Sequence, residues 1–128
     1  MAKQLILIVE DNEKNRKLAR DVLQFKGYDV IESETAEDGI RLAREKKPAL
    51  VLMDFHLPGM NGIDALKALR ADAATKAIPV IAVTASAMTE DRQKIMVAGF
   101  DALQTKPINV KEFLEAVQQT LAKGGATK

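Results

Sequence analysis

The chain contains no cysteine and only one histidine. Disulfide bonds and thiolate metal sites are therefore excluded, and a reducing compartment fits this composition. The chain also lacks an excess of charge of either sign, since 19 basic residues face 18 acidic residues for a net charge of +1. Because a nucleic-acid-binding surface needs a basic patch or arm, we expect no nucleic-acid partner.

Long hydrophobic runs are also missing, and no apolar stretch could cross a bilayer. The first residues, Met1-Ala2-Lys3, lead directly into a strand-like segment, so we expect neither a membrane association nor a signal peptide and predict a cytoplasmic protein. The 128 residues are 47% hydrophobic and 29% charged, which is typical of one soluble globular domain. We expect this domain over residues 1–122, followed by a flexible tail over residues 123–128.

Short apolar runs alternate with longer amphipathic stretches along the whole chain. The runs that predict strands are Leu5–Val9, Tyr28–Glu32, Leu50–Met53, Val80–Val83 and Ala102–Gln104. The stretches that predict helices are Asn12–Phe25, Thr35–Lys46, a segment around Ile63–Leu69, Thr89–Ala98 and Val110–Leu121. Five strands, each followed by a helix, predict an α/β fold with a parallel sheet covered by helices on both faces.

Apolar residues at helical spacing predict the apolar face of each helix. In the first helix this face carries Leu18, Val22 and Phe25. The last helix has the clearest stripe, made of Val110, Phe113, Leu114, Val117 and Leu121. Asn109 and Glu112 stand at its start in the spacing of a capping box.

Residues that can carry chemistry follow four of the five predicted strands. They are Glu10 and Asp11 after the first strand, Asp54 after the third, Thr84 after the fourth and Lys106 shortly after the fifth. In a doubly wound sheet, function gathers outside the carboxyl ends of the strands, so we expect these side chains to converge. Three carboxylates held together repel one another and need a cation, and oxygen ligands favour a hard ion such as Mg²⁺.

A carboxylate in this set can act as a nucleophile toward phosphorus and form an aspartyl phosphate. A metal ion, a lysine and a hydroxyl donor suit the neutralisation of the phosphoryl oxygens during that attack. Each residue taken alone has a structural explanation, for example an acid pair that stabilises a helix N-terminus. Their joint placement after four strands of one sheet favours the functional interpretation.

Four segments resemble the signatures of CheY-like receiver domains, the response regulators of bacterial two-component signalling. These segments are Val9–Asn12, Leu52–Gly62, Val83–Ala85 and Thr105–Pro107. The resemblance covers the chain from about Gln4 to Leu121, and within the family it points to free-standing, single-domain receivers that act on cell-cycle kinases. It implies a flavodoxin-like (βα)5 fold, a doubly wound parallel sheet with the strand order 2-1-3-4-5.

The resemblance implies that Asp54 accepts a phosphoryl group from the phosphohistidine of a sensor histidine kinase or a histidine phosphotransfer protein. It further implies that Asp11 binds Mg²⁺ directly and that Glu10 does so mostly through water. Asp54 and the backbone carbonyl of His56 complete the implied protein ligands. The His56 side chain is expected to be exposed rather than bound to a metal.

Thr84 and Lys106 are implied to bind the phosphoryl oxygens, the Lys106–Pro107 peptide to be cis, and the small Ala85 to leave access to the phosphate. The side chains of His56 and Ser86 would border the route of attacking water. One departure from the family pattern stands three residues before the lysine, where Leu103 replaces the usual tyrosine or phenylalanine. That aromatic ring normally turns inward on phosphorylation, so its absence puts the standard switch in question but leaves the phosphorylation chemistry.

Three functions are open at this point. The favoured one is a signalling switch, not an enzyme, that changes its affinity for a downstream protein through the face around residues 89–121. A Mg²⁺-dependent phosphatase with an aspartyl-phosphate intermediate would normally carry a second aspartate two residues after the first, where this chain has His56. A phosphate-independent adaptor would be indicated by loss of the acid pair, Asp54 or Lys106, and none is lost.

Overall fold

The computed structural model describes residues 4–57, 59–85, 89–106 and 108–126. The strands are β1 (Leu5–Val9), β2 (Asp29–Ser33), β3 (Leu50–Asp54), β4 (Val80–Thr84) and β5 (Ala102–Thr105). The helices are α1 (Glu13–Phe25), α2 (Ala36–Lys46), α3 (Gly62–Ala71), α4 (Thr89–Ala98) and α5 (Val110–Ala126). All five predicted strands and all five predicted helices are therefore present. Most of the strands begin or end one residue away from the predicted position.

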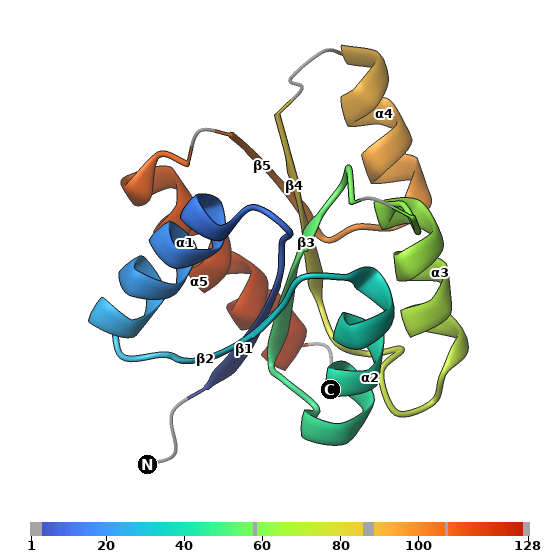
Figure 1. Ribbon diagram of the computed structural model, residues 1–128, viewed down its shortest axis with the longest axis horizontal. Helices are drawn as coiled ribbons and strands as arrows, with labels where there is room; N and C mark the ends of the chain where they lie inside the picture. The colour runs from blue at the N-terminus through green and yellow to red at the C-terminus, as the bar shows by residue number, and fades with distance from the viewer. Residues whose placement is uncertain (1–3, 58, 86–88, 107, 127–128) are drawn as a thin grey trace.

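The strands form one parallel sheet in the order β2-β1-β3-β4-β5, which confirms the predicted fold class and strand order. Helices α1 and α5 cover one face of the sheet, and α2, α3 and α4 cover the other (Figure 1). Two apolar clusters result, one on each face. Strands β3 and β4 are buried at every position, because a sheet covered on both sides exposes neither of its faces.

The register of the sheet brings the carboxyl ends of four strands to one edge. Val9 at the end of β1 pairs with Met53, the residue before Asp54. Thr84 at the end of β4 pairs with Thr105, the residue before Lys106. The residues that follow β1 and β5 and those that end β3 and β4 are therefore neighbours in space, as the alternating pattern predicted.

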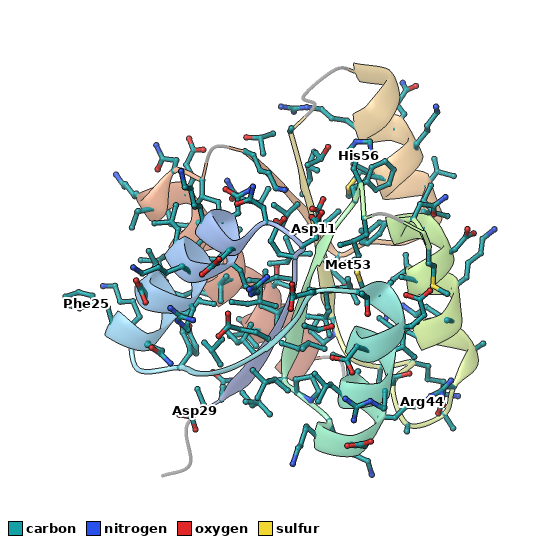
Figure 2. The ribbon with its side chains drawn as sticks, in the orientation of Figure 1. Asp11, Phe25, Asp29, Arg44, Met53 and His56 are labelled. Carbon is teal, nitrogen blue, oxygen red and sulfur yellow. The ribbon has the colours of Figure 1, made fainter. Side chains whose placement is uncertain are left out.

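The predicted apolar face of α1 is wrong in part. Leu18 and Phe25 are exposed, and Phe25 projects from the end of the helix away from the sheet (Figure 2). The residues that α1 buries against the sheet are Ala19 and Leu23, each one position along from a predicted residue. Val22 is half-buried against the same apolar cluster, and Val22 and Phe25 border a surface hollow together with Val110 and Leu114 of α5. The helix packs on the sheet through the adjacent strip that carries the small Ala19.

Gly39 allows a close approach between α2 and the end of β1. A Cβ atom at this position would lie 2.7 Å from Cγ2 of Val9, which is shorter than real side-chain contacts. The glycine lowers the intrinsic stability of α2, but it lets the helix pack directly on β1, the strand that Glu10 follows. The local cost to the helix therefore has a tertiary reason.

Helix α5 extends further than the sequence indicated. It runs to Ala126, whereas residues 123–128 were expected to form a flexible tail. Once a helix is nucleated, each added residue gains a hydrogen bond at small cost, so the helix continues past the half-buried Leu121. The domain boundary at residue 122 stays a prediction, and residues 127–128 lie outside the described part.

Among the described residues, no helix is long and apolar enough to cross a membrane.

Candidate functional site

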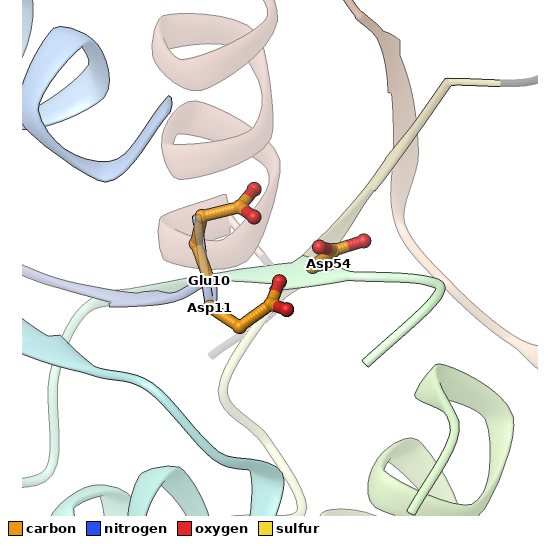
Figure 3. A group of neighbouring side chains, drawn as sticks. All are labelled: Glu10, Asp11 and Asp54. Atoms are coloured by element: carbon orange, nitrogen blue, oxygen red, sulfur yellow. The ribbon is translucent and has the colours of Figure 1, made fainter. Parts of the chain in front are cut away.

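Three carboxylates meet at the carboxyl edge of the sheet. Glu10 and Asp11 directly follow β1, and Asp54 is the last residue of β3. One oxygen from each carboxylate lies within 4.8 Å of the other two, and all three groups point into the same space (Figure 3). Glu10 and Asp54 are buried while Asp11 is exposed, so the cluster opens to solvent on the Asp11 side. The predicted convergence of these three residues is confirmed.

Lys106, which follows the edge strand β5, contacts the cluster. Its ammonium nitrogen lies 2.9 Å from Glu10 Oε1 and 3.1 Å from Asp54 Oδ2. The lysine side chain is only 17% exposed, and the two carboxylates are less exposed still, so water screens these pairs poorly. Burial alone would lower the pKa of Lys106, but the hydrogen bond to Glu10 and the charge of Asp54 outweigh it and raise the pKa above its usual value.

The surroundings of Glu10 raise the pKa of its carboxyl group. Burial, followed by the hydrogen bond and the charge of the neighbouring Asp54, raises this pKa from 4.5 to about 7. The Lys106 ammonium and the N–H of Asn12, which donates to Glu10 Oε2 at 3.1 Å, both lower the pKa but do not cancel the effect of burial. A buried carboxylate with this cost of ionisation gains when a cation arrives.

Asp54 is held through both of its oxygens. Oδ1 accepts a hydrogen bond from the backbone N–H of His56 at 2.9 Å, and Oδ2 faces Lys106. The His56 side chain is exposed, as expected, and its ring packs edge-on against Phe55. The backbone of residue 56 is therefore at the site, while its imidazole points away from it (Figure 2). The role of the His56 carbonyl as a metal ligand stays a prediction.

Thr84 and Ala85 stand where β4 leaves the sheet. Thr84 is fully buried, and its carbonyl accepts a hydrogen bond from the N–H of Lys106 at 2.8 Å. This bond ties the end of β4 to the segment that carries the lysine. Ala85 is exposed beside it. The expectations for Ser86 and for a cis bond at Pro107 fall on residues outside the described part of the chain.

These residues fit a divalent cation that prefers oxygen ligands. Three carboxylates on a pre-formed edge supply the donors, and one of them reaches solvent, which suits an ion that keeps several water molecules. Burial and, after it, the neighbouring Asp54 carboxylate raise the pKa of Glu10, so a bound cation would stabilise its ionised form. The donor set contains neither sulfur nor imidazole, which favours Mg²⁺ over softer metals.

Two hydrogen bonds to Glu10 were not predicted from the sequence. Asn12 caps α1 by accepting a hydrogen bond from the Asn15 N–H, and its own N–H donates to Glu10. Arg16 donates from Nη1 to the Glu10 carbonyl at 2.9 Å. Side chains in the first turns of a helix tilt back toward its N-terminus, so a contact between Arg16 and the residues before α1 could have been expected. The partner atom could not, because it belongs to the backbone and no residue type marks it.

Comparison with known proteins gives matches over nearly the whole chain. Residues 6–118 match the response regulator receiver domain. The polar-differentiation response regulators DivK of Brucella anthropi and Brucella ovis are each 43% identical to this chain over 116 residues, which is 91% of this chain and 94% of each relative. These matches confirm both the family resemblance and the narrower likeness to free-standing receivers.

Solved structures of receiver domains also match this chain. The receiver domain of the sensor histidine kinase PA1611 from Pseudomonas aeruginosa PAO1, with a magnesium ion coordinated in its active site cleft, is 31% identical with a TM-score of 0.87, over 94% of this chain and 99% of its own. A CheY-like receiver domain protein from Methanospirillum hungatei JF-1 is 30% identical with a TM-score of 0.88, over 99% and 100% of the two chains. This chain belongs to the response regulator receiver domain family, which serves signalling rather than conventional enzyme catalysis.

Proposed function

We propose that this protein is a Mg²⁺-dependent phosphoacceptor switch of a two-component system, with Asp54 as the site of phosphorylation. The observation that carries the proposal is the meeting of three carboxylates and Lys106 at one edge of the sheet. The phosphodonor is the phosphohistidine of a sensor histidine kinase or of a histidine phosphotransfer protein. Membership of the receiver family supports this choice of donor.

Asp54 Oδ2 is the proposed nucleophile. It attacks phosphorus, the new O–P bond forms, the P–N bond to the donor imidazole breaks, and the released nitrogen keeps the electron pair of that bond and takes up a proton. The Asp54 Oδ1 atom stays oriented by the N–H of His56 during this step. Lys106 already lies 3.1 Å from Oδ2 and can follow the charge onto the phosphoryl oxygens. Thr84 is proposed to donate its hydroxyl to the same group.

Glu10, Asp11, Asp54 and the His56 carbonyl are the proposed ligands of Mg²⁺. When bound, the ion neutralises negative charge on the carboxylates and on the transferring phosphoryl group. Asp11 is the exposed member of the set and is proposed to bind directly. Glu10 is buried and engaged with Lys106, so it is proposed to act mostly through water.

A downstream protein is proposed to bind the face around residues 89–121. Helix α4 on this face exposes two neighbouring apolar side chains, Met96 and Val97. Exposed apolar groups side by side suit a contact with another protein more than with water. Phosphorylation would shift the population between two states of this face, and so change the affinity for that protein.

The test is to incubate the protein with a small-molecule phosphodonor and Mg²⁺ and to locate the adduct by mass spectrometry. We expect one phosphoryl group on Asp54, none on an Asp54→Asn variant, and none in EDTA. Asp64→Asn, which removes an exposed acid from α3, is the matched control and should be phosphorylated normally. An equal yield from the Asp54→Asn variant would contradict the assignment. If neither a small-molecule phosphodonor nor a cognate kinase phosphorylates any of these proteins, the result would favour the adaptor function.

A further inference from the structure

One guanidinium group connects the acid pair to the edge strand of the sheet. Arg16 in α1 donates from Nη1 to the backbone carbonyl of Glu10 at 2.9 Å. The same group donates from Nε to Glu32 Oε1 in β2 at 3.1 Å. Both side chains are mostly buried, at 16% exposure for Arg16 and 27% for Glu32. A planar, partly buried group with two fixed partners has little freedom to reorient.

The Glu10 carbonyl belongs to the peptide that places Asp11. Asp11 is exposed, and its side chain forms no hydrogen bond or ion pair with any residue in the described part of the chain. Its position therefore depends on the backbone before it. The other groups of Glu10 are already fixed, since its N–H donates to the Ser33 carbonyl at 3.0 Å and its carboxylate engages Asn12 and Lys106. Arg16 holds the remaining group, the carbonyl of the 10–11 peptide.

We propose that Arg16 is a positioning residue of the metal site, and that it raises the affinity for Mg²⁺ by fixing the Glu10–Asp11 peptide against β2. The inference rests on the proposed function, because it assigns a purpose to the geometry of the same carboxylates. Partners that orient metal ligands typically contribute about 10- to 100-fold to metal affinity. Arg16 acts through a backbone carbonyl, so we expect the lower end of this range.

Simple charge effects predict the opposite sign. Arg16 carries a positive charge near the carboxylates, so its removal should strengthen cation binding if attraction and repulsion were all that mattered. Replacement by lysine keeps the charge and removes only the rigid fork that reaches two partners together. Weaker Mg²⁺ binding by Arg16→Lys is therefore a signature of positioning and not of charge.

Arg20 supplies a matched control on the next turn of α1. Its Nη1 donates to both oxygens of the same Glu32, at 3.0 and 3.3 Å, and none of its recorded contacts among the described residues is with Glu10. Arg20→Lys alters the same carboxylate by the same chemical change. It leaves the bond to the Glu10 carbonyl in place.

The experiment is a Mg²⁺ titration of the full chain, followed by amide chemical shifts or by calorimetry, on wild type, Arg16→Lys and Arg20→Lys. We expect the Mg²⁺ Kd to rise about tenfold in Arg16→Lys and to stay within about twofold of wild type in Arg20→Lys. The carbonyl carbon shift of Glu10 and the amide shift of Asp11, recorded in EDTA, should move only in Arg16→Lys. Thermal melts in EDTA establish that both variants are folded.

The outcomes separate the two claims. Wild type that binds no Mg²⁺ at millimolar concentration contradicts the proposed function, and the inference falls with it. Wild type that binds while Arg16→Lys binds equally well contradicts the inference alone. Equal weakening in both lysine variants also contradicts it, because the loss would then come from Glu32 and not from the Glu10 carbonyl.

Discussion

The ammonium group of Lys106 lies 2.9 Å from Oε1 of Glu10, so a residue that follows the last strand is paired with one that follows the first. The lysine thereby lies within ion-pair distance of two of the carboxylates that are proposed to bind Mg²⁺. In this state its positive charge partly replaces that of a metal ion. Binding of Mg²⁺ and the Lys106–Glu10 pair are therefore expected to compete.

Replacement of Lys106 by methionine should strengthen Mg²⁺ binding and destabilise the metal-free protein. The competing cation is lost, while two buried carboxylates are left without their partner. Loss of one member of a buried ion pair typically costs about 3–5 kcal/mol, and we expect about 2 kcal/mol because Glu10 can take up a proton instead. Urea denaturation in EDTA and a Mg²⁺ titration measure the two effects. Lys94→Met on the exposed side of α4 is the control, and equal Mg²⁺ affinities in all three proteins would refute the competition.

The stability of the metal-free protein should fall as the pH rises from about 4.5 to about 7. Burial raises the pKa of Glu10 from 4.5 to about 7, so in this window the folded state binds more protons than the unfolded state. The free energy of unfolding then decreases with pH and levels off above the raised pKa. A shift of this size corresponds to a change on the order of 3 kcal/mol.

Thermal melts from pH 4.5 to 8 in EDTA, for wild type and Glu10→Gln, measure this effect as the difference between two profiles. Other groups titrate in both proteins and cancel. We expect the difference to grow up to about pH 7 and to shrink when saturating Mg²⁺ is added to wild type. Parallel profiles would show that Glu10 ionises in the fold as freely as in the unfolded chain.

Replacement of Gly39 by alanine should destabilise the protein although alanine is the better helix former. The gain in helix propensity is about 1 kcal/mol, whereas forcing an extra methyl into a packed core typically costs about 1–3 kcal/mol. The added Cβ would meet Val9 at 2.7 Å, so we expect a net loss of about 1 kcal/mol in urea denaturation. A Val9→Ala background should relieve the clash and make Gly39→Ala stabilising. The same loss in both backgrounds would place its cause elsewhere.

The absence of an aromatic residue at position 103 should limit how far phosphorylation reorganises the face around residues 89–121. Leu103 is half-buried and packs against the apolar cluster under α2, α3 and α4, where it has no hydroxyl to exchange between water and protein. Amide shifts with the phosphoryl mimic beryllofluoride should be large near Asp54, Thr84 and Lys106 and modest over residues 89–121. Leu103→Tyr should extend them over that face. A full rearrangement in wild type, to which tyrosine adds nothing, would show that Leu103 is no functional departure.

The sequence by itself determined the order of strands and helices and the residues that stand at the strand ends. Both are local properties. A run of apolar residues predicts a buried strand, and Asn12 and Asn109 stand directly before apolar-periodic stretches and do cap α1 and α5. Once five βα units make one parallel sheet, residues after its strands must share an edge. The convergence of Glu10, Asp11 and Asp54 could therefore be predicted.

Only the tertiary structure decided which of these groups touch and how. The pairing of Lys106 with Glu10 depends on the twist and register of strands far apart in the sequence, and the contact of Arg16 with a backbone carbonyl has no residue-type signature. The buried side of α1 also could not be deduced, because Leu18–Val22–Phe25 and Ala19–Leu23 are both plausible apolar strips. Contact with the sheet selected the strip with the smaller side chain. The spacing of residues along a helix predicts which of them share a face, whereas long-range packing determines which face is buried.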